Sequence, residues 1–258
     1  MESEMKAADR AQAASHDEQP NIERSSMGSN EDYEKRLQGK SIRYRTPSTS
    51  FEQASLFDDS AARGDTFDLS GEDLDSLAKR VAECRRCPLW EERTRTVFSN
   101  GSKRARLMFV GEAPGREEDL QGLPFVGRAG KLLTKILDSV GLARDEVYIT
   151  NILKCRPPNN RDPNEEEVRA CEPYLARQIE LLKPVLICAL GRVAAQNLLK
   201  TNASLSVLRG GIHYYNDTRV IVTYHPAALL RNPHLKRSAW EDIKLVRKIY
   251  DEEIAGEE

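Results

Sequence analysis

A short apolar run that breaks into glycines and a proline constrains this chain more than any other feature. Residues 107–110, LMFV, have the length and composition of a buried strand. Residues 111–115, GEAPG, contain two glycines and a proline, which exclude both a helix and a central strand. A second glycine-rich segment, 122–127, precedes a helix-like run at 129–140. In open α/β sheets, ligands bind beyond the carboxyl ends of strands, so Glu112 lies where a site is expected. A Gly/Pro-rich connection that carries a solvated acid is the alternative interpretation.

Three more apolar runs predict further strands. They cover residues 146–150 (EVYIT), 184–190 (PVLICAL) and 219–224 (RVIVTY). Helices are predicted around them at residues 74–82, 129–140, 192–199 and 238–249, and another from Pro163, with Asp162 as its capping acid. Strands that alternate with helices indicate an α/β fold with a parallel sheet covered on both faces. Glu112, Asn151 and His225 would then follow strand ends along one edge of that sheet.

The charges divide the chain into a tail and a basic domain. Residues 1–75 carry 17 acidic and 9 basic residues without a sustained apolar period, which predicts disorder. Residues 76–250 have a net charge near +11, which favours a polyanionic partner, although solvated helix faces would account for part of it. The first residues do not form a signal peptide, and no apolar run approaches the roughly 20 residues of a membrane helix. We therefore expect a cytoplasmic protein that does not bind membranes.

Four of the five cysteines occur in two pairs that suggest metal ligands. Cys84 and Cys87 are spaced C-x2-C, and Cys155 and Cys171 are spaced C-x15-C. The arginines between the first two cysteines favour thiolates. Four thiolates suit either a structural zinc or an iron–sulfur cluster, and the spacing does not decide between them. Four unrelated thiols are the alternative. Cys188 lies inside an apolar run and is predicted to be an inert core thiol.

Four motifs in order resemble the type 4 uracil-DNA glycosylases, the iron–sulfur branch of that superfamily. They are GEAPG (111–115), GLPFVGRAG (122–130), YITNILKCRPPNNRDP (148–163) and HPAALLRNP (225–233). The type 5 branch typically lacks the acid that stands here as Glu112. A covalently trapping branch has an inserted basic loop that this chain lacks. The resemblance covers residues 76 to about 250 and implies a three-layer α/β/α sandwich around a four-stranded parallel sheet. We therefore divide the chain into a disordered tail, residues 1–75, and a uracil-DNA glycosylase-like domain, residues 76–258.

The resemblance also implies a monofunctional enzyme that hydrolyses the glycosidic bond of uracil in single- and double-stranded DNA and leaves an abasic site for base excision repair. It implies a [4Fe–4S] cluster, with zinc as the alternative. The ligands would be Cys84, Cys87, Cys155 and Cys171.

Residue roles follow from the same motifs. A buried base must first be rotated out of the duplex. Gly111, Phe125 and Asn151 would bind the extruded uracil, Phe125 by stacking and Asn151 by pairing with its edge. His225 would stabilise the departing base, and Glu112 would orient water, with Glu118 as a second candidate. The DNA contacts would come from Lys131, Leu229, Leu230 and Arg231, although core packing is the alternative for each leucine.

Two other functions remain open. The chain could be a glycosylase for another deaminated base such as hypoxanthine, or a non-catalytic nucleic-acid-binding relative. Separately, residues 53–57, QASLF, resemble the bacterial sliding-clamp-binding peptide, with Gln53, Leu56 and Phe57 at its characteristic positions. Such a peptide would tether the enzyme to newly made DNA. We expect the enzyme itself to act as a monomer.

Overall fold

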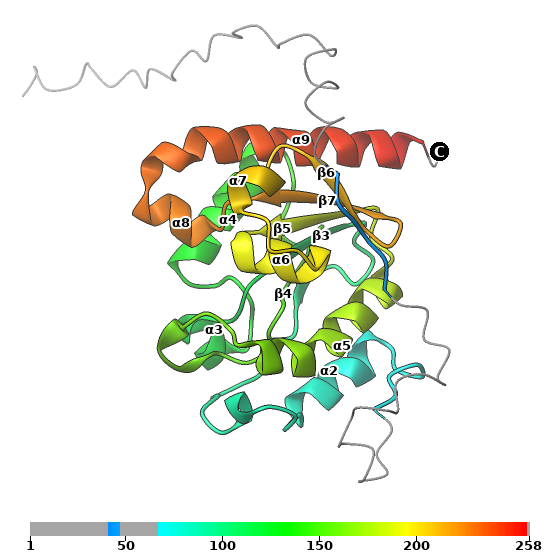
Figure 1. Cartoon of the computed structure of the whole chain (residues 1–258), viewed down its shortest axis with the longest axis vertical. Coiled ribbons are helices and arrows are strands. Elements are labelled where there is room, and N and C mark those ends of the chain that lie inside the picture. Colours follow the sequence, from blue (N-terminus) through cyan, green and yellow to red (C-terminus); the bar gives the residue numbers. More distant parts are fainter. Residues whose placement is uncertain (1–40, 47–66, 257–258) are drawn as a thin grey trace, which may run out of the picture.

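The computed structural model describes residues 41–46 and 67–256, which form a sheet with helices on both faces (Figure 1). The sheet has seven strands in the order β1-β6-β7-β5-β3-β4-β2. The bounds are β1 Arg43–Tyr44, β2 Asn100–Gly101, β3 Leu107–Gly111, β4 Tyr148–Asn151, β5 Leu186–Leu190, β6 Ile212–Tyr215 and β7 Thr218–Thr223. Strands β7, β5, β3 and β4 are parallel, so the predicted four-stranded parallel sheet is confirmed as the centre.

Three short edge strands were not predicted. Strands β6 and β2 run antiparallel to their neighbours β7 and β4, and β1 adds parallel to β6. Strand β1 and the start of helix α2 (Leu74–Ala82) lie within the predicted disordered tail, so that prediction was wrong for residues 41–46 and 67–75. The Ile42 N–H donates to Nδ1 of His213 (3.1 Å), and the Arg43 guanidinium lies 3.7 Å from the ring centre of Tyr214. These contacts join distant parts of the chain, and local composition does not reveal them.

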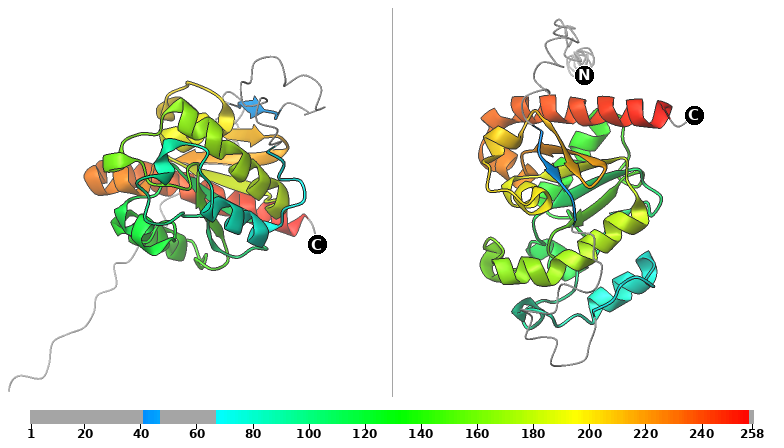
Figure 2. Two further views of the ribbon diagram at one scale, coloured as in Figure 1. Left: turned by 90° about the horizontal axis from the view of Figure 1, so that it is seen from below. Right: turned by 45° about the vertical axis from the view of Figure 1, so that its right-hand side comes forward.

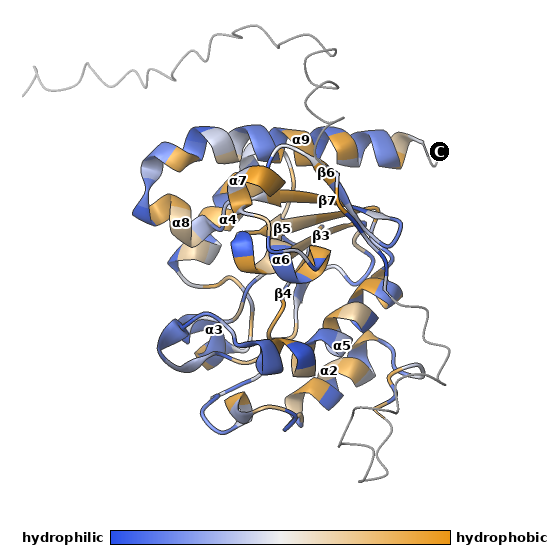
Figure 3. Cartoon of the chain, viewed as in Figure 1, coloured by the Kyte–Doolittle hydropathy of each residue, from blue (hydrophilic) through white to orange (hydrophobic). Residues whose placement is uncertain are grey.

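Helices cover the two faces of the sheet (Figure 2), and its central strands consist largely of hydrophobic residues (Figure 3). From β3, Leu107 and Phe109 pack in one cluster with α4 and α9, whereas Met108 and Val110 pack in another with α2, α5 and α6. The longer helices are α2 Leu74–Ala82, α4 Arg128–Ser139, α5 Glu165–Leu182, α6 Arg192–Leu199 and α9 Lys236–Ala255. The short ones are α3 Arg116–Gln121, α7 Leu205–Leu208 and α8 Pro226–Arg231. No helix in the described ranges has the length and apolar character needed to cross a membrane.

Helix α5 begins later than predicted. Its N-cap is Asn164, whose side chain accepts the Glu167 N–H (2.8 Å), while the Glu167 carboxylate accepts the Asn164 N–H (3.0 Å). This reciprocal capping box satisfies two backbone donors at the helix start. Asp162 therefore does not cap the helix, and its carboxylate pairs instead with Arg192 at the start of α6.

Candidate active site

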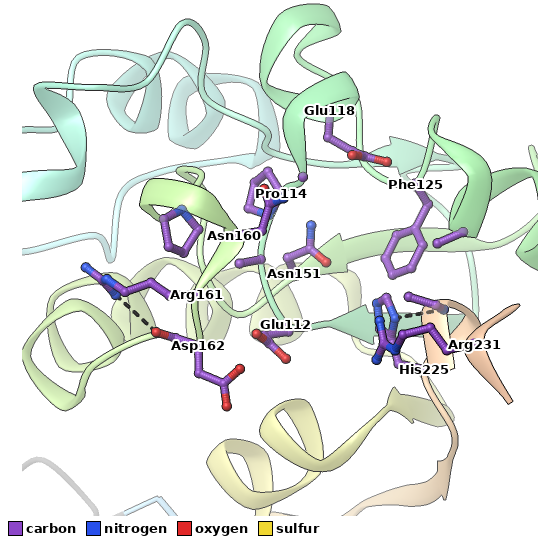
Figure 4. Close-up of a pocket in the computed structure, with 15 residues that line it drawn as sticks. Glu112, Pro114, Glu118, Phe125, Asn151, Asn160, Arg161, Asp162, His225 and Arg231 are labelled. Carbon is purple, nitrogen blue, oxygen red and sulfur yellow. Dashed lines mark hydrogen bonds between the residues drawn. The ribbon is translucent and has the colours of Figure 1, made fainter. Parts of the chain in front are cut away.

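A pocket of about 400 Å³ opens at the carboxyl ends of the central strands. Glu112 follows β3, Asn151 ends β4, and His225 follows β7, so the prediction that these residues share one edge of the sheet is confirmed. Figure 4 shows their side chains together with that of Phe125 around the same space. The lining also includes Pro114, Glu118, Asn160, Arg161, Asp162 and Arg231.

Gly111 makes this arrangement sterically feasible. A Cβ atom at this position would lie 2.3 Å from Oδ1 of Asn151 and 2.5 Å from Cζ of Phe125. Both distances are far shorter than any normal contact of a Cβ atom. The glycine at the end of β3 therefore allows the amide and the aromatic ring to meet at the floor of the pocket.

Phe125 is held in an unusual backbone conformation. Its φ is +54°, in the left-handed region that costs a non-glycine residue roughly 1–2 kcal/mol. One Glu118 oxygen accepts the N–H groups of Val126 (3.0 Å) and Gly127 (2.9 Å), the two residues that follow. Arg144 donates to the carbonyl of Pro124 (2.6 Å), the residue before it. Hydrogen bonds to the main chain on either side of Phe125 therefore hold its backbone in place, and its ring lines the pocket.

Asn151 presents an acceptor without a partner. The residue is 2% exposed, and its Oδ1 atom is buried and receives no hydrogen bond from the described residues. An unpaired buried acceptor is costly, and native proteins tolerate one chiefly where a ligand satisfies it. The amide is therefore ready to accept an N–H from a bound molecule.

His225 is neutral and has a defined tautomer. Its Nδ1 atom accepts the Ala227 N–H (3.2 Å) at the start of α8, so the ring proton is on Nε2. Burial, together with the nearby charge of Arg231, lowers the pKa of His225 to about 4. The ring centre lies 5.5 Å from that of Phe125. His225 is thus a neutral hydrogen-bond donor beside the aromatic wall of the pocket.

Two carboxylates approach the pocket from different elements. Burial raises the pKa of Glu112, and the negative charge of Asp162 raises it further. Asp162 is also paired with Arg192 at 2.8 Å. The sequence pattern predicts a helix cap at Asp162 and does not reveal its position at the pocket. The available sequence signal was the position of Asp162 in the polar segment NNRDP (159–163), which belongs to the connection after β4.

The predicted DNA contacts separate into two groups. Leu229 is 2% exposed and packs within the protein, so it cannot act as a wedge in this conformation. Leu230, on the same helix α8, is 40% exposed, and Arg231 lines the pocket. Lys131 is exposed on α4 but does not line the pocket. Leu230 and Arg231 therefore remain the candidates nearest the site.

The four predicted cysteine ligands come together in a second cavity, away from the pocket at the strand ends, which we call the base pocket below for the role proposed for it. Cys84, Cys87, Cys155 and Cys171 line one small cavity, and all four are free thiols. Cys188 is buried in β5 and outside this group, as predicted. In the part of the chain that the structure describes, no three His, Cys, Asp or Glu side chains form a site for a single metal ion.

The surroundings of these cysteines differ from the expectation that nearby arginines favour thiolates. Burial raises the pKa of Cys87 and of Cys155, and raises that of Cys171 to about 12. The two arginines between the first cysteines instead lie over the rings of Trp90 and Phe67. Burial therefore favours the protonated thiols of Cys87, Cys155 and Cys171, and a metal group would have to displace these protons on binding.

Comparison with known proteins agrees with this geometry. The sequence model of the uracil DNA glycosylase superfamily matches residues 98–244. A type-4 uracil-DNA glycosylase of Archaeoglobus fulgidus is 47% identical over 186 residues, 69% of this chain and 94% of that protein. One of Sulfurisphaera tokodaii is 46% identical over 185 residues, 68% of this chain and 84% of that protein. A type-5 enzyme of Pyrobaculum aerophilum is 31% identical over 188 residues, 60% of this chain and 83% of that protein.

The chain therefore belongs to the uracil-DNA glycosylase superfamily. The higher identity to type-4 than to type-5 proteins assigns it to the type-4 branch, which agrees with the acid Glu112 after β3.

Proposed function

We propose that this protein hydrolyses the glycosidic bond of uracil in DNA and leaves an abasic site for base excision repair. The observation that carries the proposal is the unpaired, buried Oδ1 atom of Asn151 in a pocket that Phe125 and the neutral His225 also line. These three side chains suit an extruded pyrimidine, because its flat face can stack on a ring and its N–H can donate to an acceptor.

Base recognition follows from the amide. Oδ1 of Asn151 accepts N3–H of uracil, and its Nδ2 donates to O4. Cytosine presents an acceptor at N3 and a donor at C4, so the same amide opposes it at both positions. Such a mismatch costs roughly 1–3 kcal/mol for each buried group left unpaired.

Two residues assist bond cleavage, one at the base and one at the sugar. As the bond breaks, the base becomes anionic, and Nε2–H of His225 donates to its O2 atom. The sugar becomes cationic, as in other glycoside hydrolyses. The carboxylate of Glu112 offsets that charge and orients the attacking water. Glu118 supports Phe125 through its two main-chain bonds rather than acting on water.

A release assay tests this function. Purified protein should release uracil from single and double strands, and the product should break only after heat or alkali. Strand cleavage without that treatment would contradict monofunctional hydrolysis. Release of hypoxanthine but not uracil would favour the other deaminated base, whose N1–H and O6 also match the amide. Binding to DNA without release of any base would make the protein a non-catalytic relative.

We also propose that Cys84, Cys87, Cys155 and Cys171 hold a [4Fe–4S] cluster. The cluster would act structurally, since its ligands come from the segment before the sheet, the loop after β4, and α5. The shared cavity and the hydrogen bond from Arg93 to Sγ of Cys155 (3.2 Å) support this assignment. Protein purified anaerobically should be yellow-brown with about four irons per chain. Colourless protein with one zinc per chain would refute it.

Binding to the bacterial sliding clamp is a separate proposal. Gln53, Leu56 and Phe57 lie outside the described residues, so the proposal rests on sequence. A peptide of residues 48–62 should bind a bacterial clamp with micromolar affinity, and L56A plus F57A should abolish it. No binding at a hundredfold higher concentration would end the proposal. We further propose that the enzyme acts as a monomer in the cytoplasm, where a reducing environment suits the five free thiols.

A further inference from the structure

Lys154 is a buried lysine between the cysteine cavity and the base pocket. Its exposed fraction is 1%, and it precedes Cys155 in the chain. It lines the cysteine cavity but not the base pocket. A buried amine is costly unless its donors are satisfied, so its hydrogen bonds indicate why a lysine is present.

The side chain of Lys154 bonds to the end of strand β4. Its Nζ atom donates to the main-chain oxygen of Asn151 (2.6 Å) and to Oγ1 of Thr150 (2.8 Å). Both acceptors belong to the last two residues of the strand that ends at the base pocket. The ammonium group therefore holds the main chain of the residue whose side chain faces the base.

The main chain of Lys154 bonds to the cysteine site. Its N–H donates to Sγ of Cys171 (3.3 Å), and its carbonyl accepts the Val97 N–H (2.8 Å). One residue thus contacts a proposed cluster ligand through its backbone and the uracil-reading residue through its side chain. No second residue is needed to connect the two sites.

We propose that Lys154 is a positioning residue that couples the cysteine site to base recognition. By fixing the carbonyl of Asn151, it fixes the direction of the amide on the same residue. The inference rests on the proposed roles of Asn151 and of the cysteines. A lysine that only stabilises the core would affect unfolding, whereas a positioning residue affects uracil affinity in the folded protein.

The central experiment is K154M in the full chain, purified anaerobically. Methionine retains length and loses both the donors and the charge. Binding of free uracil, measured by calorimetry, should weaken about 10- to 100-fold, because methionine leaves the buried carbonyl of Asn151 without its donor. The iron content should remain near four per chain. Unchanged uracil affinity would overturn the proposal, whether iron is retained or lost.

T150V tests the same link without altering the lysine or a cysteine. It removes one of the two acceptors of Nζ, so uracil affinity should fall by a smaller factor than in K154M. Should K154M fail to fold, unchanged uracil affinity in T150V would overturn the proposal. Y148F is the matched control, because the buried Tyr148 hydroxyl accepts from Nε2 of Gln178 (2.8 Å) in the same polar group as Thr150 but is not hydrogen-bonded to Lys154. Y148F should keep wild-type uracil affinity.

N151A separates failure of this link from failure of the site assignment. Loss of uracil affinity in N151A with full affinity in K154M would refute the link alone. Full affinity in N151A would refute the role of Asn151 itself.

Discussion

Gly111→Ala provides a direct test of how the base pocket is built. The added Cβ would lie 2.3 Å from Oδ1 of Asn151 and 2.5 Å from the ring of Phe125, whereas ordinary contacts of a Cβ begin at 3.4 Å. Each side chain must therefore retreat by about 1 Å. Gly111 ends a strand, whose backbone alanine adopts without strain, so the effect comes from contact alone.

A displacement of this size breaks the proposed hydrogen bond to uracil. Bonds between N–H and oxygen are formed over a range of only about 0.5 Å in length. Losing one buried bond costs about 1–3 kcal/mol, equivalent to a 5- to 150-fold loss of affinity. We expect G111A to weaken uracil binding by that factor and to slow single-turnover release from DNA.

The assay must separate misplacement from misfolding. Overpacking itself costs about 1–3 kcal/mol of folding free energy, so binding should be measured well below the melting temperature and with iron content checked. Gly71→Ala is the control, because a Cβ there would meet no atom within 4 Å. A folded G111A protein with wild-type uracil affinity and release rate would show that the amide and ring do not bind the base as proposed.

Other substitutions test the remaining roles. H225A should slow single-turnover release about 10²- to 10³-fold and leave DNA affinity largely intact, and wild-type kinetics would refute its role. Burial raises the pKa of Glu112, so the rate should fall as pH drops through that raised value, because the protonated acid no longer offsets the sugar charge. His225, with a pKa of about 4, stays neutral in that range. E112Q should therefore flatten the fall of the rate at low pH. An unchanged fall in the pH–rate profile would contradict this assignment. C171S should lose iron while C188S keeps it, and equal iron contents would contradict the ligand set.

The centre of the fold was predictable because it depends on local pattern. The four parallel strands are apolar runs bounded by glycine, proline or polar residues, and α2 and α6 begin and end where their periodicity predicts. The edges were not predictable in the same way. Strands β1 and β2 have two residues each, and their positions depend on partners about 170 and 50 residues away. No window of local sequence contains that information.

The same distinction applies to the site. Glu112, Asn151 and His225 could be inferred because each follows a strand, and topology brings strand ends together. Asp162 and Lys154 could not, because their roles depend on which side chains face them across the fold. Lys154 stands beside a predicted ligand, but only the structure places its ammonium group on the carbonyl of Asn151.

The two acids of the first connection illustrate how geometry separates a first and a second candidate for one role. Glu112 and Glu118 lie six residues apart, and either could have been the acid beside the sugar. The Glu118 carboxylate accepts two main-chain N–H groups at 2.9–3.0 Å, so moving it toward a water would release the loop that carries Phe125. Glu112 receives no such hydrogen bond within the described residues, and burial already disfavours its charge. A cationic sugar would relieve that cost as it forms, which is the behaviour expected of a group that stabilises the transition state more than the ground state.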